Sequence, residues 1–242
     1  MELKAKNIEI GFVKGNAIFS PVSFSATEGD MIALLGVNGI GKSTLLRTIA
    51  CLQPKINGQL LMDGRELTEI SAPERAQLIS IVLTERISID NITVRDFIAL
   101  GRSPYTNWLG KLSETDEEII NEVIHLMKIE KLQAKLFNHT SDGEKQKALI
   151  ARAICQQTPV VILDEPTAFL DFRNKREIMQ LLANISAQLK KIVILSTHDI
   201  ETSLEYCSKC WVMSEEKEFY EINRSERFGE EVKEKLRMLE RV

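Results

Sequence analysis

The chain has 242 residues, of which 44% are hydrophobic and 27% are charged, and its formal net charge is −4. This length and composition are typical of a globular protein with one large domain or two small ones. The acidic balance argues against nucleic acid as the main partner, because binding to a phosphate backbone requires a basic surface.

The apolar segments of the sequence predict neither a signal peptide nor a membrane-spanning helix. The N-terminal segment MELKAKNIEI has no apolar stretch of signal-peptide length, so we do not expect export. The longest apolar runs, such as MIALLGV, are far shorter than the ~20 residues that a membrane-spanning helix requires. We therefore expect that the chain does not cross a membrane by itself.

Short runs rich in β-branched and aliphatic residues, bounded by turn residues, predict strands. They are LKAKNIEI (3–10), MIALLG (31–36), LISIVL (78–83), VVILD (160–164), KIVILST (191–197) and CWVMS (210–214). Asp63-Gly64 and SEEKE (214–218) have the composition of hairpin turns. Runs such as VVIL lack polar alternation, which is typical of strands covered on both faces of a largely parallel sheet.

The strand MIALLG leads directly into Gly36-Val-Asn-Gly-Ile-Gly-Lys-Ser43, which matches G-x-x-x-x-G-K-[ST] and precedes the helical segment STLLRTIACL. Glycines let the backbone approach phosphates closely, and successive amides donate hydrogen bonds to them. Lys42 can contact the β- and γ-phosphates, and the Ser43 hydroxyl can bind Mg²⁺. We expect the Lys42 side chain to face solvent before nucleotide binds. A glycine-rich turn with a capping serine is the simpler alternative, but a chance match in this context is rare.

Helical spacing replaces the strand pattern between Ile92 and Gln157. The segments VRDFIALGR (94–102) and SETDEEIINEVIHLMKIEKLQAKLF (113–137) predict helices, the second of which begins at Ser113. We expect one domain over residues 1–242. Its parts are an α/β core at about 1–85 and 158–220, a helical subdomain at about 86–157, and a helical tail at about 221–242.

The polar segment TSDGEKQ (140–146) precedes another amphipathic helix. Ser141 and Glu144 have the spacing of a capping box, in which each side chain bonds the backbone of the other residue. A capped helix start that carries a glycine is also a site for anions. Because the helical segment separates it from Gly36–Ser43, the phosphate that it would bind is not easily the one held by its own loop.

The strand VVIL delivers Asp164 and Glu165 to the carboxyl end of the sheet. There Asp164 can hold Mg²⁺ through water, and Glu165 can orient or deprotonate an attacking water. An acidic turn after a buried strand would explain this pair if it stood alone. Together with Lys42, the pair predicts a site that hydrolyses ATP or GTP.

The order of GVNGIGKST, TSDGEKQ, VVILDEPTAFLD and ILSTHD resembles that in the nucleotide-binding subunits of ATP-binding-cassette (ABC) transporters, over nearly the whole chain. The resemblance implies an α/β fold, namely a P-loop nucleotide hydrolase core with a mainly parallel sheet, an antiparallel β edge region and a helical subdomain. It also implies ATP and Mg²⁺ as ligands. Two copies of the chain would associate head to tail and enclose two ATP molecules.

The resemblance assigns roles to single residues. The residues that would hold the triphosphate are Gly36, Asn38, Gly39, Gly41, Lys42, Ser43 and Thr44. Phe12 would stack on adenine, although a buried core phenylalanine is an equally good interpretation. The residues that would face the ATP of the second copy are Ser141, Gly143 and Glu144, with Asp171 linking the two sites. The catalytic residues would be Glu165, His198 and Lys42, and the metal contacts would be Ser43, Asp164 and Thr84.

The chain departs from the usual motifs of this family in two places. In the signature motif, Thr140 and Asp142 stand for a leucine and a glycine, and Glu144 stands for a glutamine. At the end of LISIVL the family has a glutamine that reaches Mg²⁺ and whose loop contacts the permease, whereas this chain has Thr84-Glu85. A threonine hydroxyl can approach Mg²⁺ through water, and Glu85 can either bind the metal or face solvent.

The resemblance implies an ATPase subunit that lies on the cytoplasmic face of the membrane and powers transmembrane permease subunits. The segment ITVRDFIALGRSPY is similar to that of importers for iron chelates, haem and vitamin B12, which also use a solute-binding protein. An ABC exporter ATPase is the nearest alternative. A non-transport ATPase of the family would normally show a second cassette, a coiled-coil insertion or a basic arm, and a P-loop kinase would not need TSDGEKQ or ILSTHD.

The four cysteines do not form a recognisable metal site in the sequence. Cys207 and Cys210 have the spacing of metal ligands, but no second pair accompanies them, so we expect free thiols. His125 and His139 have no motif context, and we interpret them as structural.

Overall fold

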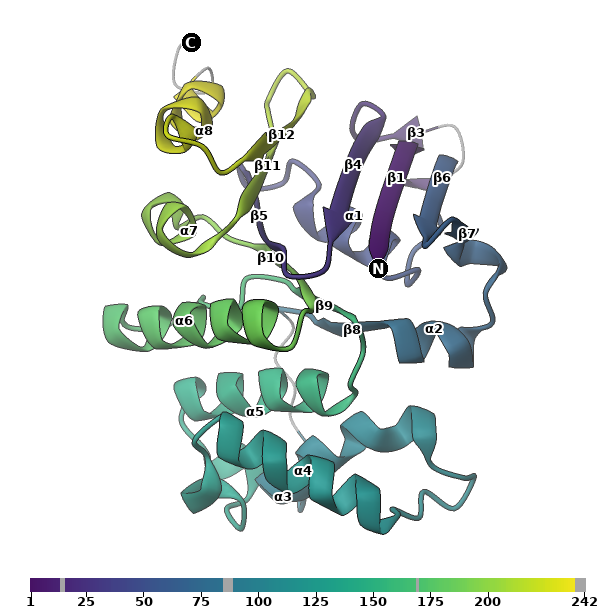
Figure 1. The fold of residues 1–242 in the computed structure, drawn as a ribbon, viewed down its shortest axis with the longest axis vertical. Helices are drawn as coiled ribbons and strands as arrows, with labels where there is room; N and C mark the ends of the chain where they lie inside the picture. The colour runs from purple at the N-terminus through teal and green to yellow at the C-terminus, as the bar shows by residue number, and fades with distance from the viewer. Residues whose placement is uncertain (14–15, 85–88, 169, 238–242) are drawn as a thin grey trace.

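The computed structural model describes residues 1–13, 16–84, 89–168 and 170–237 (Figure 1). Its central element is a six-stranded sheet with the order β12-β11-β5-β10-β9-β8. These strands are β5 (Met31–Gly36), β8 (Ile79–Val82), β9 (Val160–Leu163), β10 (Ile192–Ser196), β11 (Lys209–Met213) and β12 (Phe219–Asn223). β11, β5, β10, β9 and β8 run parallel, and β12 joins the edge antiparallel to β11. This confirms the predicted α/β fold with a mainly parallel sheet.

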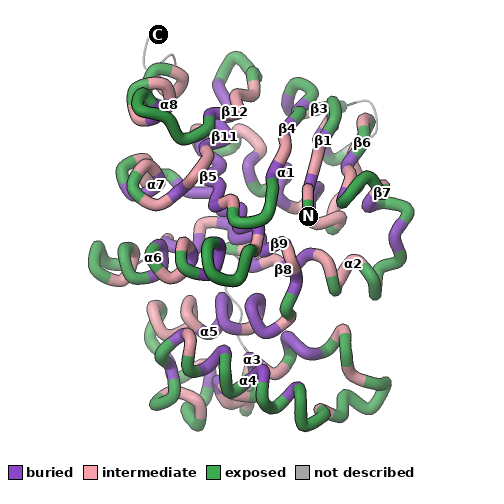
Figure 2. Tube along the Cα trace, viewed as in Figure 1, coloured by how far each residue is buried: buried purple, intermediate pink, exposed green. Residues whose placement is uncertain are grey.

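The central strands are buried along their whole length, as their uninterrupted apolar runs predict (Figure 2). Successive residues of β9 belong to two different cores on opposite faces of the sheet. Val161 and Leu163 pack with the helices that follow β8, whereas Val160 and Ile162 pack with β1, β4 and α1. The sheet is therefore fixed from both sides, and its strand ends form a rigid edge.

A second, antiparallel sheet has the order β4-β1-β6-β7, formed by β1 (Glu2–Glu9), β4 (Val22–Thr27), β6 (Asn57–Met62) and β7 (Arg65–Glu66). A small ladder of β2 (Gly11–Val13) and β3 (Asn16–Ala17) adjoins it. The helix α1 (Lys42–Ile49) shares a core with this sheet and with β5. The predicted turn at Asp63-Gly64 joins β6 to β7, with positive φ at both residues, as a type I′ turn requires.

Helices and 3₁₀ turns occupy the region between β8 and β9. They are α3 (Val94–Ala99), η2 (Leu100–Tyr105), α4 (Glu114–Leu126), η3 (Glu130–Leu132), η4 (Phe137–His139) and α5 (Asp142–Cys155). The prediction of one helix over 113–137 is wrong beyond Leu126, because Lys128 adopts a left-handed backbone conformation with φ 55°. Phe97 and Phe137 stack with ring centroids 4.2 Å apart and join α3 to η4.

The remaining helices are η1 (Leu67–Glu69), α2 (Ala72–Leu78), α6 (Phe172–Gln188), α7 (Ile200–Tyr206) and α8 (Phe228–Arg237). The predicted helical tail is partly wrong, because Glu221 to Asn223 belong to β12 and the last helix begins only at Phe228. The predicted SEEKE turn joins β11 to β12. Within the described ranges, no helix has the length and apolarity needed to cross a membrane.

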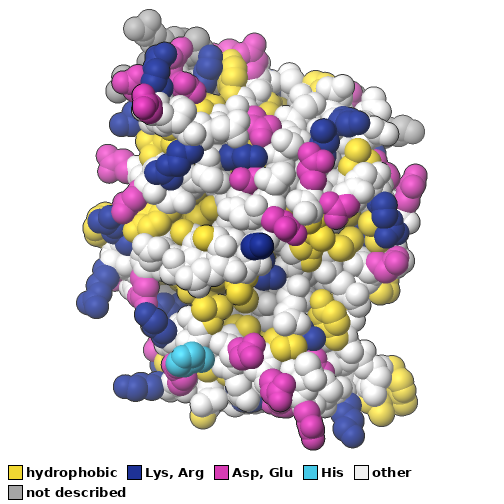
Figure 3. Space-filling model, in the orientation of Figure 1, with side chains coloured by type: hydrophobic (Ala, Val, Ile, Leu, Met, Phe, Trp, Pro, Cys, Tyr) yellow, Lys and Arg dark blue, Asp and Glu magenta, His cyan; other side chains and the backbone are white. Residues whose placement is uncertain are grey.

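The charged surface is mixed, and the four cysteines are free. On the face drawn in Figure 3, acidic and basic side chains are interspersed rather than gathered by sign. Cys207 and Cys210 are free and fully buried, and burial raises the pKa of Cys210 to about 12. No group of three or more His, Cys, Asp or Glu side chains among the described residues is arranged to hold a metal ion.

The segment LGRSPY contains a residue of a buried ion pair, Arg102, and a glycine in close backbone contact, Gly101. Arg102 donates through Nε to Asp116 Oδ1 at 2.7 Å and through Nη1 to the carbonyl of Cys155 at 2.9 Å, and both charged side chains are buried. The neighbouring Gly101 is required, because a Cβ at this position would lie 2.3 Å from the carbonyl oxygen of Arg152. Arg102 therefore holds η2 against α4 and against the end of α5.

This ion pair makes stability depend on pH in the acid range. Hydrogen bonds from the Ser113 hydroxyl and N–H, followed by the contact with Arg102, lower the pKa of Asp116 from 3.8 to about 2. A carboxylate with a lowered pKa in the folded state adds stability above its unfolded pKa and loses that contribution as the pH falls through the folded pKa. We expect the difference in unfolding free energy between the parent and Asp116→Asn to shrink between about pH 4 and pH 2. Denaturant titrations at several pH values measure it, and a difference that stays constant over that range contradicts the assignment.

Candidate functional site

The loop between β5 and α1 has the backbone that phosphate binding requires. Gly36, Gly39 and Gly41 have φ of 154°, 80° and 117°, and a Cβ on Gly36 would lie 2.7 Å from the carbonyl oxygen of Met213. The N-cap of α1 is Gly41, which provides no side-chain hydrogen bond. The N-caps of α2 to α7 do provide one, and they are Ser71, Thr93, Ser113, Ser141, Asp171 and Asp199. The first N–H groups of α1 are thus left for a ligand.

The prediction that Lys42 faces solvent is wrong. Its side chain is buried, with 6% exposure, and Nζ donates to the carbonyl oxygens of Gly36 at 2.8 Å and Val37 at 3.1 Å. Burial lowers the pKa of Lys42, while the charges of Glu165 and Asp164 oppose that shift. The ammonium group therefore lies inside the loop that would surround the phosphates. Among the other loop residues, Asn38 and Ser43 are exposed and Thr44 is buried.

Asp164 and Glu165 follow β9 at the same edge of the sheet. Asp164 is buried, and its N–H donates to the carbonyl of Val82 in β8 at 2.8 Å. Glu165 has a left-handed backbone conformation with φ 52°, which is unusual for a residue with a side chain. Backbone strain of this kind gathers at functional sites, where the surrounding contacts hold it.

His198 follows β10, and its ring contacts the carboxylate of Glu165. The distance from His198 Nε2 to Glu165 Oε1 is 2.6 Å, and the histidine side chain is 45% exposed. The fold thus brings together Lys42, Asp164, Glu165 and His198 from three segments that are far apart in the sequence. A carboxylate that a histidine orients can accept a proton from a water molecule.

Thr84 lies beside Asp164, but its hydroxyl donates to the backbone carbonyl of Asp164 at 3.1 Å. The predicted contact of this hydroxyl with a metal ion stays a prediction, for which its oxygen lone pairs are available. Glu85 lies outside the described residues.

The oxygen donors near the loop fit Mg²⁺ bound with a nucleotide. Mg²⁺ usually takes one or two protein ligands and completes its shell with phosphate oxygens and water. The exposed hydroxyl of Ser43 and the carboxylate of Asp164 are donors of this kind. When bound, the ion would supply positive charge that stabilises the phosphate oxygens.

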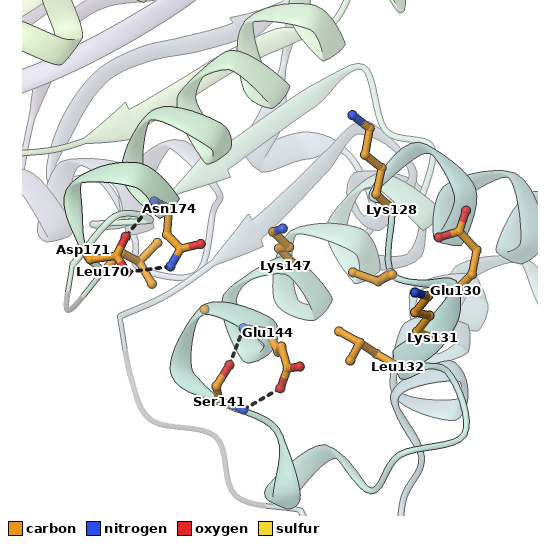
Figure 4. Close-up of a pocket in the computed structure, with 12 residues that line it drawn as sticks. Lys128, Glu130, Lys131, Leu132, Ser141, Glu144, Lys147, Leu170, Asp171 and Asn174 are labelled. Carbon is orange, nitrogen blue, oxygen red and sulfur yellow. Dashed lines mark hydrogen bonds between the residues drawn. The ribbon is translucent and has the colours of Figure 1, made fainter.

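A cavity of about 610 Å³ lies between the start of α5 and the start of α6 (Figure 4). The predicted capping box is present, because Ser141 Oγ accepts from the N–H of Glu144 at 3.3 Å and Glu144 Oε2 accepts from the N–H of Ser141 at 2.8 Å. The Ser141 oxygen therefore acts as an acceptor within the cap. The Ser141 hydroxyl also interacts with the Glu144 carboxylate, so an anion in the cavity would compete with Glu144 for its hydrogen.

The other wall of this cavity carries Asp171, which caps α6 through a bond from the N–H of Asn174 at 2.8 Å. Gly143 also lines the cavity, and a Cβ at this position would meet its nearest atoms at 3.7 to 3.8 Å, an ordinary contact. The monomer itself therefore does not require a glycine there. No residue of the loop 36–44 is among the described residues that line the cavity.

Phe12 is 76% exposed, so the interpretation as a buried core residue is wrong for this structure. It lies in β2, next to Gly11, whose carbonyl accepts from Gln53 Nε2. An exposed ring on a short ladder can stack on a planar base.

Ser196 is a residue of this site that the sequence analysis did not identify. It ends β10, is fully buried, and donates to Asp164 Oδ1 at 2.6 Å. A polar residue at the end of the otherwise apolar run IVIL was the available signal.

Comparisons with known proteins agree with this geometry. A family model described as "ABC transporter" matches residues 19–168. The chain is 39% identical to an uncharacterized ABC transporter ATP-binding protein, MJ0873, of Methanocaldococcus jannaschii, covering 86% of this chain and 71% of the relative. It is 32% identical to the petrobactin import ATP-binding protein FpuC of Bacillus anthracis, covering 80% and 71%.

Solved structures of ABC transporters and their cassettes are also similar to this chain. A proposed metal-chelate type ABC transporter in an inward-facing conformation has a TM-score of 0.79 and 26% identity, covering 91% of this chain and 82% of that chain. The dimeric structure of the ABC transporter cassette MJ0796 has a TM-score of 0.78 and 25% identity, covering 92% and 99%.

Proposed function

The chain belongs to the ABC transporter family and is an ABC ATPase, and from this premise we propose that it powers the import of an iron chelate, haem or cobalamin. The proposed roles of its residues are those that the motifs imply. Lys42 and the loop amides bind the triphosphate, Ser43 and Asp164 hold Mg²⁺, and Glu165, which His198 orients, accepts the proton of the attacking water.

The observation that supports ATP hydrolysis by a head-to-tail dimer is the separation of two half-sites within one chain. The cluster around Lys42 lies at the sheet edge, whereas Ser141 and Asp171 line a cavity that contains no loop residue among those described. Two copies placed head to tail would bring the Ser141 cavity of one copy over the nucleotide of the other. Dimeric cassettes such as MJ0796 support this arrangement.

The cargo and the direction of transport are supported by relatives rather than by the site. FpuC is described as a petrobactin import protein, and CbrD of Dickeya dadantii, 31% identical over 84% of this chain and 76% of the relative, as an achromobactin transport protein. We place the chain on the inner face of the cell membrane, with permease subunits and a solute-binding protein as partners.

A groove of about 280 Å³ is the proposed docking site for a cytoplasmic helix of the permease. It lies between the end of α1, α2, η2 and α5, and its lining includes Leu52, Ile81 and Leu100. Leu52 and Leu100 are 60% and 45% exposed, which is high for large apolar side chains. The LGRSPY segment forms one wall, and the buried Arg102–Asp116 pair keeps that wall in place.

We expect Leu100→Asp to abolish transport by removing the permease contact. The matched control is Leu189→Asp, because Leu189 is 47% exposed and lines a different apolar cavity beside α4. Uptake of a ferric chelate, haem and cobalamin is measured in a strain that lacks the chain. The parent and the control should restore uptake of one cargo, and Leu100→Asp should not.

Two results contradict these assignments separately. If the parent restores uptake of none of the three cargoes, the cargo class is wrong. If Leu100→Asp restores uptake as well as the control does, the groove is not the docking site. Thermal unfolding of both purified variants checks that each folds.

A further inference from the structure

Side-chain hydroxyls from both neighbouring strands hold the turn at Asp164 and Glu165. From β10, the fully buried Ser196 donates to Asp164 Oδ1 at 2.6 Å and accepts from the N–H of Glu165 at 2.9 Å. From the end of β8, Thr84 donates to the carbonyl of Asp164 at 3.1 Å. The turn is therefore held at three points, namely the side chain of Asp164, the N–H of Glu165 and the carbonyl of Asp164.

The Ser196 hydroxyl has a single hydrogen, and the geometry decides where it points. The N–H of Glu165 can only donate to Ser196, so the hydroxyl hydrogen is free to lie between Ser196 and Asp164 Oδ1, which accepts it. The short distance is typical of a charge-assisted bond. This bond takes one of the two lone-pair directions of Oδ1, so Oδ2 is the oxygen of Asp164 with more acceptor capacity left for a metal-bound water.

The second bond acts on Glu165. Its left-handed backbone, φ 52°, directs the side chain toward His198, at 2.6 Å. A residue in this conformation needs surrounding contacts to hold it. The bond from its N–H to the buried Ser196 supplies one, since Ser196 belongs to a strand that is paired on both sides.

We propose that Ser196 is a positioning residue that selects the metal-facing oxygen of Asp164 and holds the backbone of Glu165, with Thr84 supporting the turn from the other side. This inference rests on the proposed roles of Asp164 and Glu165. The alternative is that Ser196 only satisfies a buried polar group. That alternative predicts a loss of stability and no change in metal binding.

The test compares Ser196→Ala with Ser80→Ala. Ser80 is also a buried serine of the same sheet, in β8, but its hydroxyl bonds Thr158 at 2.9 Å near the start of β9. The first readout is amide hydrogen exchange of Glu165 by NMR in the nucleotide-free protein. It should be at least about tenfold faster in Ser196→Ala and unchanged in Ser80→Ala, because only the first variant removes the acceptor of that N–H.

The second readout is Mn²⁺ affinity with a non-hydrolysable ATP analogue, measured by electron paramagnetic resonance. Ser196→Ala should weaken it, and should lower kcat with little change in the KM for ATP. Loss of an outer-shell partner typically costs about 10- to 100-fold in metal affinity or activity. Thr84→Ala should act in the same direction and less strongly, since it leaves the carboxylate bond intact. Ser196→Cys fills a similar volume with a weak donor and serves if the alanine variant does not fold.

Unchanged Glu165 exchange and unchanged Mn²⁺ affinity in Ser196→Ala would overturn the inference. Asp164→Asn shows whether the site assignment survives that result. If Asp164→Asn weakens Mn²⁺ binding while Ser196→Ala does not, only the role of Ser196 is wrong. If neither variant weakens it, the proposed role of Asp164 fails, and the inference fails with it.

Discussion

Glu165→Gln is expected to lower the rate of ATP hydrolysis by about 10²- to 10⁴-fold while ATP still binds, the range that general base catalysis supplies. A glutamine cannot accept the proton of the attacking water, but its amide oxygen can still accept from His198 Nε2, now at 2.6 Å from the carboxylate. The substitution therefore removes proton acceptance and keeps the hydrogen bond that positions the histidine.

The same variant should accumulate an ATP-bound dimer, because binding closes the two copies and hydrolysis opens them again. Size-exclusion chromatography with Mg-ATP measures this, alongside a phosphate-release assay. Glu205→Gln is a suitable control, since Glu205 is an exposed carboxylate paired with Arg176 away from the site. A monomeric Glu165→Gln protein, or one that hydrolyses ATP at the parent rate, would show that Glu165 is not the base.

The strands whose ends carry the site residues were predictable from their sequences alone. β5, β9 and β10 are uninterrupted apolar runs, and a strand covered on both faces needs no polar alternation. β4 was not predicted, although its segment VSFSAT alternates as a half-buried strand does, because its serines and threonine also occur in loops. β12 was not predicted as a strand, because FYEIN is half exposed and its pairing with β11 is a tertiary contact.

The contacts of the site were less predictable than its residues. The motif placed Lys42 in a phosphate loop, but its burial and its bonds to the Gly36 and Val37 carbonyls depend on how the loop folds over itself. The pairing of His198 with Glu165 depends on which loops meet at the sheet edge, and local periodicity carries no information about that. Capping boxes are local, and the predicted one at Ser141 is present.

The largest effect expected in the Ser141 cavity comes from Ser141→Arg, which should block ATP hydrolysis with little change in ATP binding to the same chain. The substituted side chain enters the cavity between α5 and α6, where the nucleotide of the second copy is proposed to lie. It also removes the helix cap, which costs about 1 kcal/mol of stability. Ser71→Arg controls for that loss, because Ser71 caps α2 with the same box and is also exposed.

Mixing Ser141→Arg with Lys42→Ala chains decides whether the cavity acts on its own nucleotide or on that of the second copy. In a mixed dimer that works across the interface, one site combines both substitutions and the other is intact. Random pairing makes half of the dimers mixed, with one intact site each, so the mixture should recover about a quarter of the parent rate. If the cavity served its own chain, every site would carry one substitution and no activity would return. A mixture as inactive as its two components would therefore reject the head-to-tail arrangement.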